Sequence, residues 1–332
     1  MKITFFSAKP YDREFFDLYN KTYGFKLEYF ETHLGPHIVN IVEDCEAVCV
    51  FVNDKLNAET ISVLASKNIK IIALRCAGFN NVDLGTARKY GIKVCRVPAY
   101  SPEAVAEHAV AMILTLNRKT HKAYNRVREQ NFSLNGLLGF NLHGKTVGVI
   151  GTGKIGRSFC KIMLGFGVKL LASDIIENEE LKKLGVNYTS FDKLLEQSDV
   201  ISLHCPLTAE SHHLINKETL ARMKQGMMLI NTSRGGLINT QDIIAALKKG
   251  QVGYLGIDVY EQEEKLFFRD LSGKIIEDDE IQRLMSFPNV LITAHQAFFT
   301  SEALAQIAQV TLDNIAQLSA GKIPKDELVL LK

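Results

Sequence analysis

Short apolar stretches alternate with longer amphipathic stretches along most of the chain. Within residues 1–100 the apolar stretches predict strands, and the amphipathic stretches between them predict helices. The predicted strands are 3–6, 48–52, 71–74 and 93–97, and the predicted helices are 11–19, 58–66 and 84–90. Strands that alternate with helices in this way are typical of a parallel α/β sheet.

A second series of the same kind begins near residue 146. Its predicted strands are 147–150, 169–173, 200–203, 227–230, 254–257 and 290–293, with one helix starting at Ile155 and a last helix over 302–318. Six strands with crossover segments fit a doubly wound sheet. A long helix starting at Pro102 separates the two series, and we expect its apolar run, 104–116, to be buried between two domains.

The length of the chain also favours two domains, because 332 residues exceed the size at which a single hydrophobic core is usual. We expect the first domain to comprise residues 1–100 and to be completed by 300–332. The second domain then comprises residues 101–299.

Composition narrows the class of protein. Hydrophobic residues make up 46% of the chain and charged residues 23%, and the formal net charge is only +2 without any block of like charges. Nucleic-acid and membrane-surface binding therefore receive no electrostatic support. No apolar stretch reaches the roughly 18 residues that a membrane-spanning helix needs, and the N-terminus does not resemble a signal peptide.

Six cysteines are present, and none of them forms a Cys-x-x-Cys motif. Most of them lie in apolar runs, which favours buried, reduced thiols in a cytoplasmic protein over a disulfide or zinc framework. We expect no metal site. The six are Cys45, Cys49, Cys76, Cys95, Cys160 and Cys205.

The segment Gly151-Thr152-Gly153-Lys154-Ile155-Gly156 follows the apolar run 146–150 directly. This order of strand, glycine turn and helix is the dinucleotide-binding fingerprint. One glycine allows the tight turn, one lets the backbone approach a pyrophosphate, and one allows close packing of helix and strand. The phosphates would bind at the N-terminus of the helix, where backbone N–H groups are free.

Polar residues follow the later strands, at the edge where ligands bind in open parallel sheets. Asp174 comes about 20 residues after the glycines, where an acid can bind the ribose hydroxyls and repel a 2′-phosphate, which favours NAD over NADP. Its alternative is a helix N-cap. Arg234 follows another strand, and its planar fork suits a carboxylate, although a structural ion pair at a strand end is an equal alternative.

His295 follows the last strand and could pass a proton to a carbonyl oxygen near neutral pH. Alone it would more often be a packed or surface histidine, but the small residues Ala294 and Ala297 beside it favour a catalytic role. A carboxylate could pair with its imidazolium and stabilise the charged form. Glu261, Glu263 and Glu264 compete for this role on the residues alone.

At these residues the chain resembles the D-isomer-specific 2-hydroxyacid dehydrogenases, and within them the D-lactate dehydrogenase branch. The resemblance extends over nearly the whole chain, and its motifs cover residues 75–83, 97–108, 151–156, 231–235, 258–261 and 295–298. Many relatives have proline where this chain has Ala294, but the His295-Gln296 pair and the stretch 265–288 look like the D-lactate branch.

The resemblance implies a flavodoxin-like substrate domain and a doubly wound Rossmann NAD domain, joined by long helices. It implies that Arg234 binds the substrate carboxylate, that His295 is the acid/base, and that Glu263, rather than Glu261 or Glu264, orients His295. The implied NAD site consists of Gly151, Gly153, Lys154, Ile155, Gly156, Asp174, Cys205, Pro206, Ser211, Thr232, Ser233 and Asp258. The implied substrate site adds Phe51, Ala77, Gly78, Tyr100 and Phe298 to Arg234 and His295.

The expected activity is therefore the NAD-dependent, reversible reduction of pyruvate to D-lactate, a reaction of fermentation. One alternative is a dehydrogenase for bulkier 2-oxo acids such as phenylpyruvate. A second is a non-catalytic NAD-sensing binding protein, which would be expected to carry disordered extensions that this chain does not show. The family also implies a homodimer or homotetramer, and no nucleic-acid or membrane partner.

Overall fold

The computed structural model describes residues 1–324, and the chain divides into two compact units. Within the described residues, the first unit consists of Met1–Ser101 together with residues 299–324, and the second of Pro102–Phe298. The last part of the expected completing segment 300–332, residues 325–332, lies outside the described residues.

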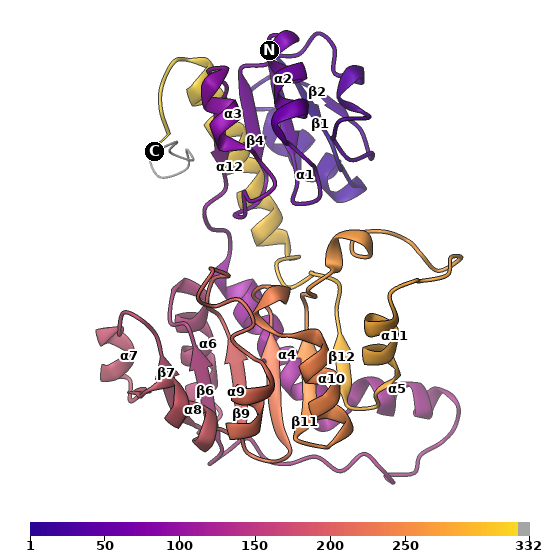
Figure 1. The fold of residues 1–332 in the computed structure, drawn as a ribbon, viewed down its shortest axis with the longest axis vertical. Helices are drawn as coiled ribbons and strands as arrows, with labels where there is room; N and C mark the ends of the chain where they lie inside the picture. Colours follow the sequence, from indigo (N-terminus) through magenta and orange to yellow (C-terminus); the bar gives the residue numbers. More distant parts are fainter. Residues whose placement is uncertain (325–332) are drawn as a thin grey trace. The chain divides into compact units, whose positions relative to one another are not determined.

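The first unit contains a five-stranded parallel sheet with the order β2-β1-β3-β4-β5, which is the flavodoxin-like order. Helices lie on both faces of the sheet (Figure 1). The strands are β1 (Lys2–Phe5), β2 (Lys26–Tyr29), β3 (Ala47–Val50), β4 (Ile71–Leu74) and β5 (Lys93–Arg96). The helices are α1 (Pro10–Asn20), α2 (Ala58–Ser66), α3 (Leu84–Lys89) and α12 (Ser301–Ser319), with a 3₁₀ turn at Val39–Ile41.

The interior strands β3 and β4 are buried at every position and consist of aliphatic residues and cysteine or alanine. This is the composition expected of parallel strands that are covered on both faces. The sequence pattern does not predict β2, because its residues Lys-Leu-Glu-Tyr belong to a partly exposed edge strand and form no apolar run.

The second unit contains a seven-stranded parallel sheet with the order β12-β11-β10-β9-β6-β7-β8. Counted from β6, this is the doubly wound Rossmann order with one added strand. The strands are β6 (Thr146–Ile150), β7 (Lys169–Ser173), β8 (Asn187–Tyr188), β9 (Val200–Leu203), β10 (Met227–Asn231), β11 (Val252–Ile257) and β12 (Val290–Ile292). The short edge strand β8 was not among the six strands predicted.

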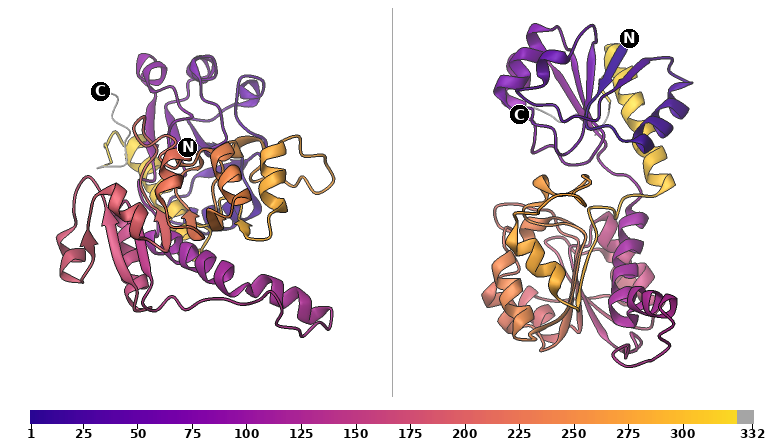
Figure 2. Two further views of the ribbon diagram at one scale, coloured as in Figure 1. Left: turned by 60° about the horizontal axis from the view of Figure 1, so that its bottom comes forward. Right: turned by 90° about the vertical axis from the view of Figure 1, so that its right-hand side faces the viewer.

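Helices cover both faces of this sheet (Figure 2). They are α4 (Pro102–Arg118), α5 (Thr120–Arg128), α6 (Lys154–Leu164), α7 (Glu179–Lys183), α8 (Phe191–Gln197), α9 (Lys217–Arg222), α10 (Thr240–Lys248) and α11 (Asp279–Ser286), with 3₁₀ turns at Gly235–Leu237 and Glu263–Lys265. The expectation that the run 104–116 lies between domains is wrong. That run packs inside the second unit, where Ile113 and Leu116 share a core with Phe159.

The prediction of two parallel α/β sheets is confirmed. All six cysteines are free, and Cys205 is the least buried of them. Among residues 1–324 no helix combines the length and the apolar character that crossing a membrane requires.

Candidate active site

The glycine turn connects β6 to α6 at the point where the strand order reverses, between β6 and β9. Gly151 has φ +91°, and a Cβ there would lie 2.7 Å from the amide nitrogen of Cys205. A Cβ on Gly156 would lie 2.0 Å from the carbonyl oxygen of Gly151. Both positions therefore need glycine, and the N-terminus of α6 is left open at the exposed residues Gly153 and Lys154.

Asp174 follows β7 and is bonded to the glycine turn. Its Oδ2 accepts hydrogen bonds from the amide of Thr152 at 2.5 Å and from the Thr152 hydroxyl at 2.9 Å. Partial burial acts to raise the pKa of Asp174, but these bonds outweigh it and lower the pKa, so the carboxylate is ionised at neutral pH. The N-cap alternative is wrong, because Asn178 caps the helix that follows.

The loop after β9 carries three of the predicted NAD-site residues. Ser211 donates to the carbonyl of Pro206 at 2.8 Å and accepts from the Thr208 amide at 2.7 Å, which fixes the loop. Burial raises the pKa of Cys205 to about 11, so its thiol stays neutral. Burial also lowers the pKa of the neighbouring His204 to about 3, which leaves that histidine uncharged.

The turn after β10 holds Thr232, Ser233 and Arg234. The Ser233 hydroxyl donates to the carbonyl of Cys205 at 2.6 Å, which ties this turn to the β9 loop. The hydroxyl of Thr232 is buried and has no hydrogen-bond partner among residues 1–324. A buried polar atom without a partner is costly, and a bound polar ligand could satisfy it. This hydroxyl and the open glycine turn fit a dinucleotide cofactor at this edge of the sheet.

Arg234 is exposed, and within residues 1–324 its Nη1 donates only to the carbonyl of Ser233, at 2.7 Å. The backbone around it is nevertheless fixed, because buried Asn231 donates to the Arg234 carbonyl at 2.9 Å. Gly235 packs so closely that a Cβ there would lie 2.1 Å from the carbonyl carbon of Tyr260. The turn is therefore rigid, while most donors of the guanidinium stay available.

His295 and Glu263 form a direct pair. His295 Nδ1 lies 2.8 Å from Glu263 Oε1, and the two side chains are 21% and 22% exposed. The second oxygen, Oε2, accepts from the amide of Tyr260 at 2.9 Å, which orients the carboxylate. Because an ionised carboxylate can only accept, Nδ1 carries a proton, and Nε2 is the nitrogen left for a substrate.

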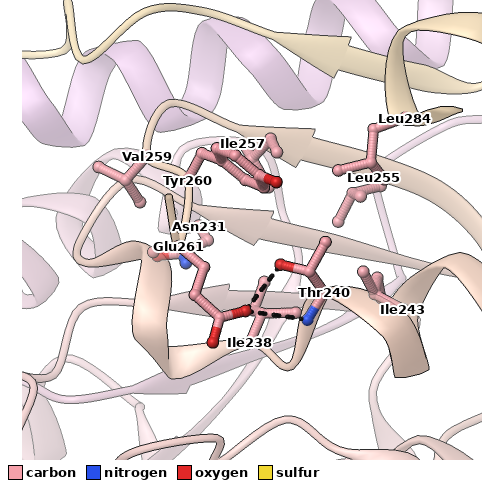
Figure 3. Close-up of a pocket in the computed structure, with 11 residues that line it drawn as sticks. Asn231, Ile238, Thr240, Ile243, Leu255, Ile257, Val259, Tyr260, Glu261 and Leu284 are labelled. Atoms are coloured by element: carbon pink, nitrogen blue, oxygen red, sulfur yellow. Dashed lines mark hydrogen bonds between the residues drawn. The ribbon is translucent and has the colours of Figure 1, made fainter. Parts of the chain in front are cut away.

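Glu261 and Glu264 do not occupy that position. Both oxygens of Glu261 are engaged elsewhere: Oε1 lies 2.6 Å from His213 Nε2, and Oε2 accepts from Thr240 (Figure 3). Glu264 is exposed. Of the three acids that the residues alone left open, the structure thus brings Glu263 to His295.

His212, His213 and Glu261 also place potential metal-binding atoms within 4.8 Å of one another. The 2.6 Å between His213 Nε2 and Glu261 Oε1 is a hydrogen-bond distance, whereas two ligands of one tetrahedral zinc lie about 3.4 Å apart for bonds of about 2.1 Å. The amide of Asn239 faces His213 Nδ1 at 3.3 Å while its oxygen caps α10. The arrangement of this group is therefore that of a hydrogen-bonded network.

Asp258 follows β11 and is completely buried. Its carboxylate accepts from the Thr293 hydroxyl at 2.5 Å and from the amides of Gln296 and Ala297 at 2.9 Å each. Burial acts to raise the pKa of Asp258, but the nearby His108 and hydrogen bonds from Thr293 and Ala297 lower it. The carboxylate thus anchors the loop that carries His295, and its contact with a cofactor stays a prediction.

The remaining predicted substrate residues include Phe298, which is buried in the second unit with its ring 6.5 Å from the His295 ring. The others belong to the first unit and follow the carboxyl ends of three adjacent strands: Phe51 after β3, Ala77 and Gly78 after β4, and Tyr100 after β5. They therefore share one edge of the first sheet.

Three residues that shape this site have no role predicted from the sequence: His108, Asn231 and Thr293. His108 and Thr293 hydrogen-bond to each other and Thr293 to Asp258, while Asn231 holds the Arg234 turn. The only available indication was their presence within or beside the motifs that carry the resemblance.

The comparisons with known proteins agree with this geometry. Residues 110–297 match the model of the D-isomer specific 2-hydroxyacid dehydrogenase NAD binding domain. The chain is 54% identical to a 2-hydroxyacid dehydrogenase homolog of Haemophilus influenzae, over 97% of this chain and 98% of that one. The chain therefore belongs to the D-isomer specific 2-hydroxyacid dehydrogenases, which are NAD-dependent oxidoreductases.

Among its relatives, the D-lactate dehydrogenase of Escherichia coli is 51% identical over 99% of this chain and all of that one. The apo-structure of the D-lactate dehydrogenase from that species has a TM-score of 0.92, covering 99% of this chain and 100% of that chain at 48% identity. D-lactate dehydrogenase from Aquifex aeolicus, solved with NAD and lactic acid, has a TM-score of 0.86 at 38% identity, covering 98% of each chain.

Proposed function

We propose that this protein is a D-lactate dehydrogenase that reduces pyruvate to D-lactate with NADH and catalyses the reverse reaction. The observation that carries the proposal is the pairing of His295 Nδ1 with Glu263 at 2.8 Å, which leaves Nε2 as the acid/base nitrogen. The relatives named D-lactate dehydrogenase support pyruvate as the substrate, and the exposed Arg234 fork suits its carboxylate.

Each residue has a separate task in this mechanism. NADH supplies the hydride that C2 of the 2-oxo acid receives. Arg234 holds the substrate carboxylate through two parallel hydrogen bonds. The protonated Nε2 of His295 donates to the C2 oxygen as the alcohol forms, and it accepts that proton in the reverse direction. Glu263 stabilises the imidazolium and keeps the ring in orientation.

The proposed cofactor contacts follow the strand ends described above. Ionised Asp174 would accept from the ribose hydroxyls and disfavour a 2′-phosphate, and Thr232 offers its unpartnered hydroxyl. Lys154, Ile155 and the loops with Cys205, Pro206, Ser211 and Ser233 complete the proposed NAD site, together with Asp258. Phe51, Ala77, Gly78, Tyr100 and Phe298 stay proposed substrate residues, on the strength of the resemblance.

The proposal also includes the location of the protein in the cell and its oligomeric state. Free cysteines support a cytoplasmic location. The oligomeric states that the resemblance to the family implies support a homodimer or homotetramer. Cell fractionation tests the location, and sedimentation equilibrium tests the assembly.

One alternative substrate class has support among the solved structures. A D-2-hydroxyisocaproate dehydrogenase has a TM-score of 0.87 at 31% identity, covering 99% of each chain, and its name indicates a bulkier substrate. The lower identity makes this the second candidate.

The test is a substrate panel with purified protein. Values of kcat/KM are measured for pyruvate, 2-oxoisocaproate and phenylpyruvate with NADH and with NADPH, and the product is resolved by chiral chromatography. We expect pyruvate to give the highest kcat/KM, NADH to be preferred, and the product to be the D-isomer. A higher kcat/KM for phenylpyruvate or 2-oxoisocaproate would select the alternative.

A further inference from the structure

Helix α4 reaches the loop of His295 through a chain of polar side chains. His108, on α4, places Nε2 at 3.0 Å from the hydroxyl oxygen of Thr293. The Thr293 hydroxyl lies 2.5 Å from Oδ1 of Asp258, which can only accept when it is ionised. The hydroxyl therefore donates to Asp258 and accepts from His108, so His108 carries a proton on Nε2.

This series of hydrogen-bonded side chains ends at the backbone of the loop that carries His295. The two oxygens of Asp258 accept from the amides of Gln296 and Ala297, and the Asp258 carbonyl accepts from the His295 amide at 2.7 Å. His295 has φ +53°, a left-handed conformation that residues other than glycine seldom adopt. Such a conformation persists where the surrounding contacts enforce it.

Because Asp258 is buried, the polar contact that His108 of α4 makes near its carboxylate is important. Asp258 is completely buried, and His108 Nε2 lies 3.5 Å from its Oδ1 while the His108 side chain is only 17% exposed. A buried carboxylate is costly unless its oxygens are satisfied. His108 is therefore a polar group from outside the loop that hydrogen-bonds to Thr293 and lies beside the Asp258 carboxylate.

We propose that His108 is a positioning residue for proton transfer. It acts through Thr293 and Asp258 to hold the backbone of residues 295–297, and it does not contact the substrate. The proposal rests on the proposed role of His295 as acid/base. A neutral imidazole with its proton on Nε2 is sufficient, so another donor at the same place should replace it.

The experiment compares two substitutions in the full-length protein. His108→Leu removes the donor, whereas His108→Gln keeps an N–H near the position of Nε2. We expect His108→Leu to lower kcat by roughly 10- to 100-fold, as expected when a catalytic group is misplaced, with little change in the KM for pyruvate. His108→Gln should recover kcat to within about threefold, because it restores a hydrogen bond to Thr293.

A second readout does not depend on activity. The amides of Gln296 and Ala297 should exchange hydrogen faster in His108→Leu than in the wild type, and His108→Gln should restore their protection. Asn117→Leu is the matched control, because Asn117 is also buried on α4 but bonds to the backbone of Phe140. It should lower stability without changing kcat or the exchange of the 295–297 loop.

The proposal would be overturned by a His108→Leu variant with normal kcat and normal loop exchange, or by a His108→Gln variant as impaired as His108→Leu. Failure of the proposed function gives a different result. In that case wild-type protein does not reduce pyruvate, and the kcat comparison moves to whichever 2-oxo acid the panel selects. The exchange measurement stands in either case, because it needs no substrate.

Discussion

Arg75 in the first unit and Arg234 in the second each follow the carboxyl end of an interior parallel strand, β4 and β10. The Arg75 side chain is 2% exposed. Its guanidinium donates to Asp12 and to the carbonyls of Phe6 and Ser7 at 2.8–3.1 Å. Arg234 is exposed, and among residues 1–324 no carboxylate forms an ion pair with it.

The difference shows how a structural arginine is told from one that is available to a ligand. Burial acts to lower the pKa of Arg75, but attraction by Asp12 raises it above its usual value, so the pair is charged inside the core. All three guanidinium nitrogens of Arg75 donate to groups of its own unit. The backbone of Arg234 is fixed by the hydrogen bond from Asn231, but its side chain is not held in this way. An arginine that binds a planar carboxylate needs a fixed backbone and guanidinium N–H groups that are not already bonded to the protein.

The largest expected effect is a loss of stability on replacing Arg75, the structural arginine of the comparison. Arg75→Met leaves the buried Asp12 carboxylate without its partner, which costs about 3–5 kcal/mol of unfolding free energy. Urea unfolding followed by circular dichroism measures this loss. The control is Arg234→Met, which should change the unfolding free energy by less than about 0.5 kcal/mol, as for other exposed positions. Equal losses in the two variants would contradict the distinction.

The next effect concerns the available arginine. Arg234→Lys replaces a planar fork by a point charge, so we expect the KM for the 2-oxo acid to rise and kcat to fall. Losing one hydrogen bond to a charged group costs about 1.5–3 kcal/mol, which corresponds to roughly a 10- to 100-fold loss in kcat/KM. Steady-state kinetics with pyruvate and NADH measures it. Near-normal kinetics would remove Arg234 from the proposed site.

The two arginines also show how far sequence reasoning extends. Apolar runs are strong indications of buried strands, so β3, β4, β6 and β9 were predictable to within a few residues. Since ligands bind beyond the carboxyl ends of parallel strands, the polar residues there were natural candidates. The pattern could not separate Arg75 from Arg234, because burial and pairing with Asp12, 63 residues away, are tertiary facts.

The same limit explains the residues and elements that were missed. His108 and Thr293 are 185 positions apart and meet only in the folded unit. The edge strands β2 and β8 lack an apolar run, since an edge strand needs little burial. The choice among Glu261, Glu263 and Glu264 required the resemblance, and the geometry then placed Glu263 on His295.

A smaller effect is expected where the carboxylate partner of His295 is changed. Glu263→Gln retains the shape but loses the charge that stabilises the imidazolium, so pyruvate reduction should fail at lower pH than in the wild type. The profile of kcat/KM against pH measures it. Glu264→Gln, at an exposed acid one residue later, is the control and should leave the profile in place.

The smallest expected effect tests whether Asp174 is available to a cofactor or, like Asp12, committed to structure. The lowered pKa of Asp174 keeps its charge down to acidic pH, so it should repel a 2′-phosphate at every pH near neutrality. Repulsion between such charges in a solvated site is worth about 1 kcal/mol, so Asp174→Asn should shift the ratio of kcat/KM values for NADH and NADPH about fivefold toward NADPH. Glu177→Gln removes an exposed carboxylate of the same segment, paired with Lys182, and should leave the ratio unchanged. An unchanged ratio in Asp174→Asn would mean that this acid does not select the cofactor. Its role would then be structural, through its hydrogen bonds to Thr152 in the glycine turn.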